Sequence, residues 1–460
     1  MFQDNLEDTI SAIATAQGQG SIGIVRISGR RALAIANKIF VPFGKKKALY
    51  FKGYTMHYGN ICEGAKSIDE VILTVMRKPK SYTRDDVVEI NCHGGIMALS
   101  RVLELTLKHG CRLASPGEFT KRAFLNGRID LAQAEAVIDI IRAKTDSALK
   151  VSLGQLKGGL SQEINKIRRK LLDILVVLEA NIDFPEEDIQ PQDTSGILPG
   201  IDAIDAGLNK LLFGASCGRI LREGIQVVIC GKPNVGKSSL LNALLKKERS
   251  IVTPVAGTTR DTVEEMLDIK GIPVKIVDTA GILKPRDLIE RKAIFRSREQ
   301  IKLADLVIIL FDASARLNAE DRKLIKEIKN KNVIAVINKI DLKARIEKDE
   351  IGRVFPKVVE LCAKNAKNIN SLEGAISEFV YQGKLFTPEF TLVSNLRHIR
   401  ALKSTKKLIE QARVSLTDKL PLEFSAQSLK DACVHLDRIL GRSFSEDILD
   451  RIFADFCIGK

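Results

Sequence analysis

Short apolar runs and glycine-rich breaks alternate in the first quarter of the chain, up to about Glu118. Runs rich in Val and Ile predict strands at Ile22–Ile27, Val71–Val75 and Val87–Ile90. A helix is expected over Gly95–Lys108, directly after the last of these strands. Glycines and prolines separate the elements, which is typical of a small α+β domain.

The apolar pattern becomes helical between about Leu131 and Glu179. Leucines and isoleucines recur every three or four residues, at Leu153, Leu156, Leu160, Ile164, Ile167, Leu171, Leu175 and Leu178. This spacing predicts one apolar stripe along a single long helix. Pro185 and the acids around it should end that helix, and a second helical block is expected over Asp202–Leu221.

From Gly224 onwards, strands and helices alternate. Four short runs predict buried strands, at Ile225–Ile229, Val274–Val277, Leu306–Phe311 and Val333–Ile337. Helical segments separate most of them, as in a mostly parallel sheet with covering helices. After about residue 381 the chain is helical again, so an α/β domain is inserted into a helical one.

Composition does not change the predicted domain organisation, but the net charge bears on the kind of partner. Apolar residues make up 45% and charged residues 28% of the 460, as in soluble globular proteins. The formal net charge of +15 favours a polyanionic partner, although charge alone is weak evidence. None of the eight cysteines forms a C-x-x-C pair, so reduced thiols and a cytoplasmic location are expected. Residues 1–10 carry three acids and no base, unlike a secretion signal.

A phosphate-binding loop follows the first strand of the α/β region. The stretch from Gly231 to Ser238 fits G-x-x-x-x-G-K-S and precedes a predicted helix, Ser239–Leu245. Its backbone N–H groups can cradle phosphates, while Lys237 should reach the β- and γ-phosphates and Ser238 should ligate Mg²⁺. The predicted nucleotide contacts here are Asn234, Val235, Gly236, Lys237, Ser238 and Ser239.

Two further motifs lie at strand ends and predict guanine as the base. The motif Asp278, Thr279, Ala280 and Gly281 closes one strand, where an Asp can hold the Mg²⁺ shell. The second motif, Asn338-Lys339-Ile-Asp341, closes another. A carboxylate at Asp341 can accept from both N1–H and the 2-amino group of guanine, a pair that adenine lacks.

Between these motifs lies a polar loop that is predicted to close over the γ-phosphate and Mg²⁺. Thr259 is the candidate second Mg²⁺ ligand. Arg260 is a candidate charge stabiliser, and a surface arginine is an equally good interpretation. Ile282 stands where Ras-type enzymes position water with a Gln, so another group must orient the water. The loop's predicted nucleotide contacts are Thr253, Pro254, Val255, Ala256, Gly257, Thr258 and Thr259.

The predicted fold class is therefore multidomain. It combines an α+β N-terminal domain, an all-α central and C-terminal domain, and an inserted Ras-like α/β P-loop GTPase domain. The predicted boundaries are 1–122 for the N-terminal domain, 123–223 and 383–460 for the two helical parts, and 224–382 for the GTPase domain.

Long motifs in every domain resemble the MnmE (TrmE) family of tRNA-modifying GTPases. The resemblance covers nearly the whole chain and is carried by five stretches: Ser21–Gly29, Pro116–Gly127, Ala180–Glu187, Gly257–Asp261 and the C-terminal Phe456-Cys-Ile-Gly-Lys460. It implies a homodimer that acts with the FAD-binding flavoprotein MnmG (GidA) as a heterotetramer. Together such proteins add a carboxymethylaminomethyl-type group to C5 of the wobble uridine, position 34, of certain tRNAs. The resemblance also implies that a reduced folate, 5-formyl- or 5,10-methylene-tetrahydrofolate, supplies the one-carbon unit, and that K⁺ aids GTP hydrolysis.

The same resemblance assigns roles to individual residues. For K⁺ it implies the ligands Asn234, Thr253, Val255 and Thr258. A bound K⁺ ion would weaken the case for Arg260 as a charge stabiliser. Glu290 resembles the family's water-orienting acid, and Cys457 resembles a cysteine needed for tRNA modification. The folate-contacting positions, which would make the N-terminal part a folate-binding and dimerisation domain, are Arg26, Glu89, Arg128 and Lys460.

Some residues depart from the family pattern, and some interpretations stay open. Arg128 stands where Lys is usual, Asn91 where His is more usual, and Leu283 where Arg is common. Cys362 replaces a Ser at the guanine-side loop. A lone Cys457 between apolar neighbours would otherwise be assigned to a core.

The remaining alternatives concern the partner and the activity. A basic stretch could hold tRNA or form a solvated helix face; it comprises Arg397, His398, Arg400, Lys403, Lys406 and Lys407. A ribosome-assembly or signalling GTPase that modifies no RNA remains the alternative function.

Overall fold

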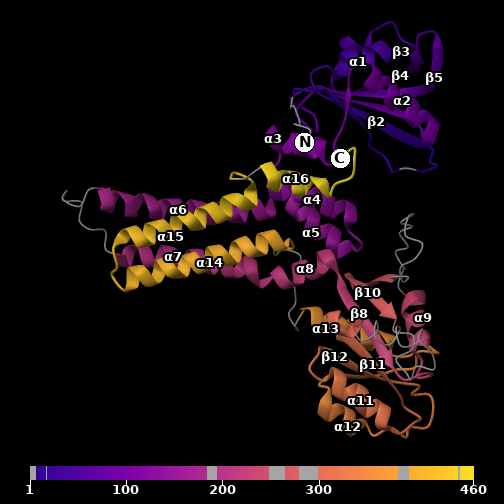
Figure 1. The fold of residues 1–460 in the computed structure, drawn as a ribbon, viewed down its shortest axis with the longest axis vertical. Helices are drawn as coiled ribbons and strands as arrows, with labels where there is room; N and C mark the ends of the chain where they lie inside the picture. Colours follow the sequence, from indigo (N-terminus) through magenta and orange to yellow (C-terminus); the bar gives the residue numbers. More distant parts are fainter. Residues whose placement is uncertain are drawn as a thin grey trace. The chain divides into compact units, whose positions relative to one another are not determined.

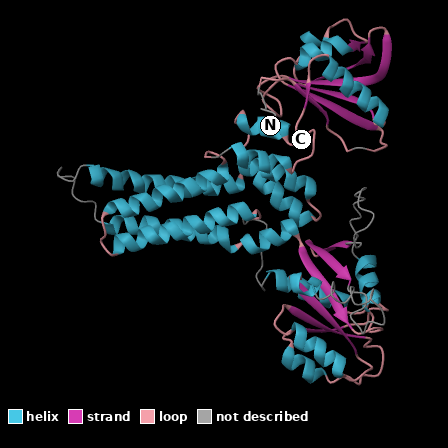
Figure 2. Cartoon of the chain, in the orientation of Figure 1, coloured by secondary structure: helices cyan, strands magenta, loops and turns pink. Residues whose placement is uncertain are grey.

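The computed structural model describes residues 7–16, 18–183, 194–247, 265–278, 299–381, 393–443 and 446–460. These form two compact units: residues 1–138 with 437–460, and residues 139–436. The predicted combination of α+β, all-α and inserted α/β regions is confirmed (Figure 2). The four domain boundaries predicted from the sequence stay a prediction.

The first unit contains a seven-stranded sheet in the order β3-β4-β5-β6-β2-β1-β7 (Figure 1). All neighbours pair antiparallel except β1 and β7, which are parallel. The three strands predicted from the sequence are confirmed as β2, β5 and β6, each longer than predicted. The strands are β1 (Ile10–Ile13), β2 (Ile22–Ser28), β3 (Phe40–Pro42), β4 (Thr55–Glu63), β5 (Lys66–Met76), β6 (Val87–His93) and β7 (Arg112–Leu113).

Two helices cover one face of this sheet, and on the other face Phe119 packs against Ile10 and Ala12 of β1. Helix α1 (Ala32–Ile39) and the predicted helix, observed as α2 (Ile96–Lys108), pack on the helix-covered face, which buries Val25, Ile27 and Ile90. Side chains alternate across a strand, so Arg26 of β2 and Glu89 of β6 point to the opposite face. The unit also contains α3 (Glu118–Leu125), the start of α4 (Leu131–Arg142) and α16 (Glu446–Ala454).

The helical part of the second unit is a bundle in which α6, α7, α14 and α15 lie side by side (Figure 1). Its helices are α5 (Asp146–Leu156), α6 (Gly159–Asp183), α7 (Thr194–Phe213), α8 (Ala215–Glu223), α14 (Leu396–Thr417) and most of α15 (Leu422–Leu440). The side chains of Leu160, Leu171 and Leu178 on α6 are fully buried, as the apolar stripe predicts.

The prediction of a single long helix through Leu153 and Leu178 is wrong. The chain turns between α5 and α6 at Gly158, whose φ of +86° is a left-handed conformation that favours glycine. Its N–H donates to the carbonyl of Gln155 at 2.8 Å. Leu153 is 38% exposed and therefore lies outside the stripe of α6.

The α/β part has a six-stranded sheet in the order β13-β12-β11-β8-β10-β9. Strands β13 to β10 are parallel, and β9 is antiparallel to β10. Buried side chains form an apolar core on each face. Its strands are β8 (Ile225–Gly231), β9 (Glu265–Ile269), β10 (Ile272–Asp278), β11 (Leu306–Asp312), β12 (Val333–Asn338) and β13 (Val358–Glu360). Its helices are α9 (Lys237–Lys247), α11 (Ala319–Ile328), α12 (Lys348–Val354) and α13 (Ile369–Tyr381).

Within the described ranges, no helix is both long and apolar enough to cross a membrane.

Candidate functional site

The predicted phosphate loop connects β8 to α9 at the centre of the parallel sheet. Strand β8 lies between β10 and β11, where strand order reverses, and ligands of such sheets bind beyond the carboxyl ends of the strands. The loop needs left-handed backbone at Gly231, Asn234 and Gly236, with φ of +147°, +63° and +101°. Ser238 and Ser239 are exposed in the first turn of α9. This turn can therefore offer free N–H groups and hydroxyls to an anion.

Lys237 points back into this loop. Its Nζ donates to the carbonyls of Gly231 at 3.0 Å and Lys232 at 2.8 Å. Two carbonyls thus hold the ammonium group at the phosphate loop, where its positive charge can meet a phosphate, as its predicted role requires.

Asn338 ties the phosphate loop to the guanine-side loops. Its side chain is 2% exposed; its Nδ2 donates to the Val235 carbonyl at 2.8 Å, and its Oδ1 accepts from the Ala363 N–H at 2.9 Å. A Cβ at Gly236 would lie only 2.3 Å from that Nδ2, so glycine is required there. The amide therefore holds together the phosphate loop, the loop after β12 and the loop that contains Ala363.

Lys339 makes a second bridge, and its partner was missed by the sequence analysis. Its Nζ donates to the Asn234 carbonyl at 2.8 Å and to Oδ2 of Asp312 at 2.6 Å. Asp312 also accepts from the N–H and hydroxyl of Ser314. Partial burial raises the pKa of Asp312, but these hydrogen bonds outweigh it and leave the pKa below its usual value. The sequence feature that could have revealed Asp312 was the position of an acid directly after the apolar run of β11.

Asp341 lies exposed beyond the end of β12, near the buried Cys362. A hydrogen bond with the Cys362 side chain is the largest cause that lowers the pKa of Asp341, and Lys364 and Lys339 add to it. The carboxylate is therefore ionised at neutral pH and can accept hydrogen bonds. The Cys362 that departs from the family pattern thus contacts the predicted guanine acceptor.

Several predicted nucleotide and catalytic residues lie outside the described residues. Asp278 ends β10, but its side chain is not described. The others are Thr253, Pro254, Val255, Ala256, Gly257, Thr258, Thr259, Arg260, Thr279, Ala280, Gly281 and Glu290.

In the first unit, the predicted folate residues Arg26 and Glu89 lie on the face of the seven-stranded sheet opposite α1 and α2. Arg26 and Glu89 are register partners, and Arg26 Nε lies 2.7 Å from Glu89 Oε1. Arg26 Nη1 donates to the Gly459 carbonyl at 3.1 Å. Their side chains are 16% and 20% exposed, so neither is a freely solvated surface charge. A half-buried cation and carboxylate side by side suit a ligand with both donors and acceptors.

Arg128 joins this group through Tyr82, which the sequence analysis missed. The Arg128 guanidinium lies 4.4 Å from the centre of the Tyr82 ring, and Arg26 lies 5.9 Å from it. The buried Nε of Arg128 has no hydrogen-bond partner within the part of the chain that the structure describes. This unpaired donor fits a site that awaits an acceptor from a ligand.

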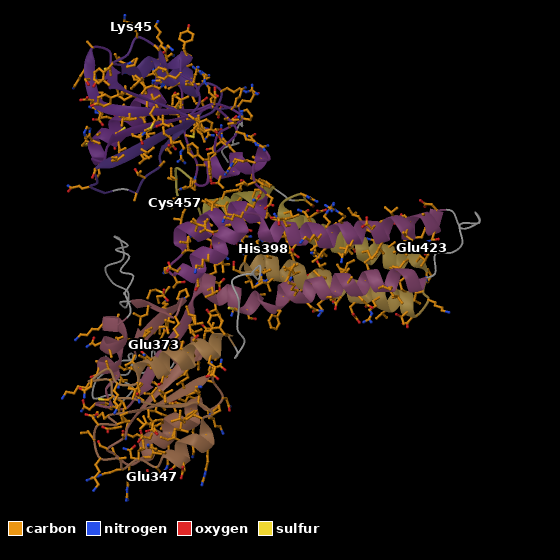
Figure 3. The ribbon with its side chains drawn as sticks, turned by 180° about the vertical axis from the view of Figure 1, so that it is seen from behind. Lys45, Glu347, Glu373, His398, Glu423 and Cys457 are labelled. Carbon is orange, nitrogen blue, oxygen red and sulfur yellow. The ribbon has the colours of Figure 1, made fainter. Side chains whose placement is uncertain are left out.

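The C-terminal segment closes the same region. The Lys460 carbonyl accepts from the Phe119 N–H at 3.1 Å. Phe456 is buried, whereas Cys457, on the segment that follows α16, is exposed (Figure 3). Exposure excludes the interpretation of Cys457 as a core residue and leaves its thiol accessible.

The basic stretch falls on α14 and divides between exposed and buried positions. Arg400, Lys403 and Lys407 are exposed, while His398 is fully buried. Lys406 donates to Asn209 on α7. The open surface of this stretch therefore consists of three cations on one side of the helix.

Two family models match the chain. The model described as MnmE helical domain covers residues 131–457, and the one described as GTP-binding protein TrmE N-terminus covers residues 9–128. The tRNA modification GTPase MnmE of Desulforamulus reducens is 47% identical over 460 residues, 99% of this chain and 100% of that protein. Its counterpart in Clostridioides difficile is 46% identical over 457 residues, which cover 99% of this chain and 100% of that protein. A crystal structure of an Aquifex aeolicus Era variant bound to GDP and AlF4⁻ is 32% identical to this chain. The match covers 40% of this chain and 66% of that one, with a TM-score of 0.29.

Proposed function

Because the chain belongs to the MnmE family of tRNA modification GTPases, we propose that it hydrolyses GTP and uses this reaction in tRNA modification. The observation that carries the proposal is the convergence of the phosphate loop, Asn338 and Asp341 at the carboxyl ends of β8 and β12. Lys237 and Ser238 would hold the phosphates and Mg²⁺, and Thr259 would be the second Mg²⁺ ligand. Mg²⁺ would neutralise charge on the transferring phosphoryl group.

We further propose that K⁺ supports hydrolysis and that Glu290 orients the attacking water. Asn234 would bind the ion through its side-chain oxygen, since the residue is exposed on the phosphate loop and its backbone carbonyl is already bonded by Lys339. Thr253, Val255 and Thr258 would complete the ion's shell. Arg260 remains the alternative source of positive charge.

The K⁺ proposal has a direct test. Hydrolysis is expected to be faster in K⁺ than in Na⁺ at equal ionic strength, and Asn234→Ala should remove the difference. Equal rates of the parent protein in the two salts would contradict a K⁺ site.

In the first unit, we propose a reduced-folate site formed by Arg26, Glu89, Arg128 and Lys460. A carboxylate such as Glu89 suits the N–H edge of a pterin, and two arginines suit carboxylate or ring oxygens. The unpaired Nε of Arg128 and the position of its guanidinium over the Tyr82 ring support a bound acceptor here. The folate would supply a one-carbon unit when bound. With the flavoprotein MnmG and Cys457, the protein would then modify C5 of the wobble uridine.

We also propose that the protein is a homodimer through its first unit. Large apolar side chains are exposed on and beside strands β3 and β4, at the open edge of the sheet; they are Phe43, Tyr50, Tyr54, Met56 and Tyr58. The rings of Phe43 and Tyr58 are in contact, with centroids 5.1 Å apart, and soluble monomers rarely expose large apolar patches. A second copy that covers this edge would bury it.

The function is tested by mass spectrometry of tRNA nucleosides. Cells that lack this protein should lose the modified wobble uridine, the parent gene should restore it, and Cys457→Ser should not. Unchanged nucleosides in the deletion strain would favour a binding switch that modifies no RNA.

A further inference from the structure

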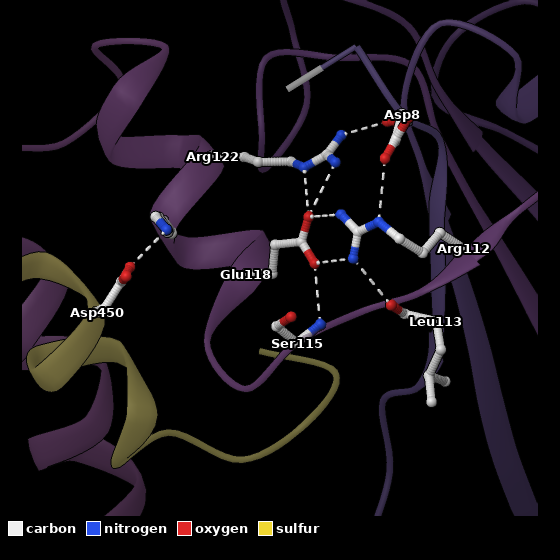
Figure 4. Close-up of polar contacts among 8 residues, drawn as sticks. Asp8, Arg112, Leu113, Ser115, Glu118, Arg122 and Asp450 are labelled. Carbon is white, nitrogen blue, oxygen red and sulfur yellow. Dashed lines mark hydrogen bonds and ion pairs between the residues drawn. The ribbon is translucent and has the colours of Figure 1, made fainter. Parts of the chain in front are cut away.

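A buried ionic cluster lies at the start of α3, next to the C-terminal segment (Figure 4). Glu118 and Arg122 are only 2% and 1% exposed. Glu118 accepts two hydrogen bonds from Arg112, at 2.6 and 3.0 Å, and one from Arg122 Nη2 at 2.9 Å. The Ser115 N–H donates to the same carboxylate at 2.9 Å. Such a fully bonded carboxylate fixes the first turn of α3.

The cluster also ties α3 to the beginning of the chain. Arg122 Nη1 donates to the Asp8 carbonyl at 2.7 Å, and Arg112 Nε lies 3.1 Å from Asp8 Oδ2. Arg112 belongs to β7, which pairs with β1. Helix α3 is therefore anchored to the sheet through side chains.

The same turn of α3 holds the C-terminal segment through its backbone. The Gly117 N–H donates to the Cys457 carbonyl at 3.4 Å, and the Phe119 N–H donates to the Lys460 carbonyl at 3.1 Å. These are N–H groups that a helix leaves free at its first turn. On the other side, Gly459 lies so close to β1 that a Cβ would meet the Ile13 carbonyl at 2.3 Å. The segment fits between α3 and β1.

From these contacts we infer that Glu118, Arg112 and Arg122 are positioning residues for the proposed folate site. They hold the first turn of α3, and this turn holds the segment that carries Cys457 and whose Gly459 carbonyl binds Arg26. None of the three is assigned to touch the ligand. The inference rests on the proposed function for its ligand, but not for the link between α3 and the C-terminal segment.

The C-terminal segment, residues 456–460, contains no strand or helix. Backbone hydrogen bonds, the bond from Arg26 to the Gly459 carbonyl and the buried side chain of Phe456 hold it in place. If the donors at Gly117 and Phe119 move, the segment gains conformational freedom, which a ligand must then remove on binding. The loss should appear as weaker ligand affinity, with little effect on the separate α/β site.

The experiment uses the full-length protein with Glu118→Gln and the milder Arg112→Lys, which keeps the charge but loses the two-pronged contact. Leu73→Ala, in the fully buried core of β5, serves as a matched control that destabilises the same unit away from α3. Three quantities are measured: affinity for 5-formyltetrahydrofolate by calorimetry, amide hydrogen exchange of peptides that contain residues 117–119 and 456–460, and the unfolding temperature.

Both cluster variants should weaken folate binding by about tenfold, as expected when a buried acceptor network is broken. They should also speed exchange in both peptides, with GTP hydrolysis unchanged. The Leu73→Ala control should lower the unfolding temperature while affinity and exchange at these peptides stay near parent values.

Parent-like exchange and affinity in a folded Arg112→Lys variant would overturn the inference, as would equal losses in the Leu73→Ala control. If the parent protein binds no folate, the proposed function fails, yet the exchange data still decide whether the cluster positions the segment.

Discussion

At the residue scale, several side chains of the described nucleotide site hold its loops in place. Asn338 uses both ends of its amide for Val235 and Ala363. Asp312 holds Lys339, which reaches the Asn234 carbonyl. Such a framework presents the loop's N–H groups in a fixed geometry before the nucleotide arrives, which reduces the entropy lost on binding.

Asp341 is the residue whose substitution should change base selection. Asp341→Asn replaces a carboxylate that accepts two hydrogen bonds with an amide whose NH₂ group cannot accept. GTP affinity should fall by about 10²-fold or more, as for a site built to pair a polar edge that is then left unpaired. Nucleotide titrations with GTP, XTP and ATP measure this. The control is Asp349→Asn, an acid on α12, and unchanged GTP affinity in Asp341→Asn would remove it from guanine recognition.

Glu290 should affect the rate of hydrolysis but not binding. Because Ile282 cannot orient water, Glu290→Ala is expected to cut the hydrolysis rate by about 10²-fold, within the range of acid–base contributions. GTP affinity should stay within a few-fold of the parent. Single-turnover hydrolysis in K⁺ buffer separates the two effects. A parent-like rate would exclude Glu290 and favour Arg260 as the catalytic group.

How much of the site was predictable depended on the kind of residue. Motif spacing predicted the phosphate loop and Asp341, since these act through local backbone geometry. Asp312 and Tyr82 were missed because their roles depend on contacts across the fold, 27 residues away in the case of Asp312 and Lys339. Arg26 and Glu89 were identified only by resemblance, because only the sheet register brings them together.

At the element scale, the exposed basic residues of α14 lie on one side of the helix. Its first turn contains no acid; Arg400 and Lys403 lie in the second turn and Lys407 in the third. Arg400, Lys403 and Lys407 have no ionic partner among the residues that the structure describes. A solvated face does not require this arrangement, whereas a polyanion such as tRNA could bind these cations through its phosphates.

The prediction for α14 concerns tRNA affinity and its salt dependence. Changing Arg400, Lys403 and Lys407 together to Gln should weaken tRNA binding and reduce the slope of log affinity against log salt by about two to three. Filter binding at several salt concentrations measures this slope. The matched control changes three exposed lysines near α11, namely Lys323, Lys326 and Lys329. Equal slopes in the two triple variants would show that α14 is only a solvated face.

Element prediction succeeded where periodicity was continuous and failed where a single residue changed the chain's direction. The buried strands β8, β11 and β12 follow directly from their apolar runs. The break between α5 and α6 was missed because the leucine spacing continues across Gly158 in phase. Strand β9 was not predicted, since it is a short edge strand whose apolar residues are interrupted by Asp268 instead of forming a continuous run.

At the scale of the whole molecule, the two sites are built in different compact units. The described residues of the nucleotide site belong to residues 139–436, and the proposed folate residues belong to the unit formed by residues 1–138 and 437–460. The first unit thus joins segments from both ends of the chain, so its site includes Gly459 as well as Arg26. Substitutions that act on one site should therefore leave equilibrium binding at the other intact.

Glu89 provides the test of this separation. Glu89→Ala removes the proposed pterin acceptor and leaves Arg26, only 16% exposed, without its 2.7 Å partner. Affinity for 5-formyltetrahydrofolate should fall by about tenfold or more, because a half-buried charge is left unpaired and a ligand N–H loses its acceptor. GTP affinity should stay within about twofold, since no described residue of the nucleotide site lies in this unit. Calorimetry with each ligand measures both quantities on one preparation. Glu70→Ala, an exposed acid on the neighbouring β5, is the matched control. If Glu89→Ala and Glu70→Ala bind folate equally well, the site does not include Glu89. If Glu89→Ala instead weakens the affinities for GTP and folate together, the two units are coupled in ligand binding, and the separation argued from the fold is wrong.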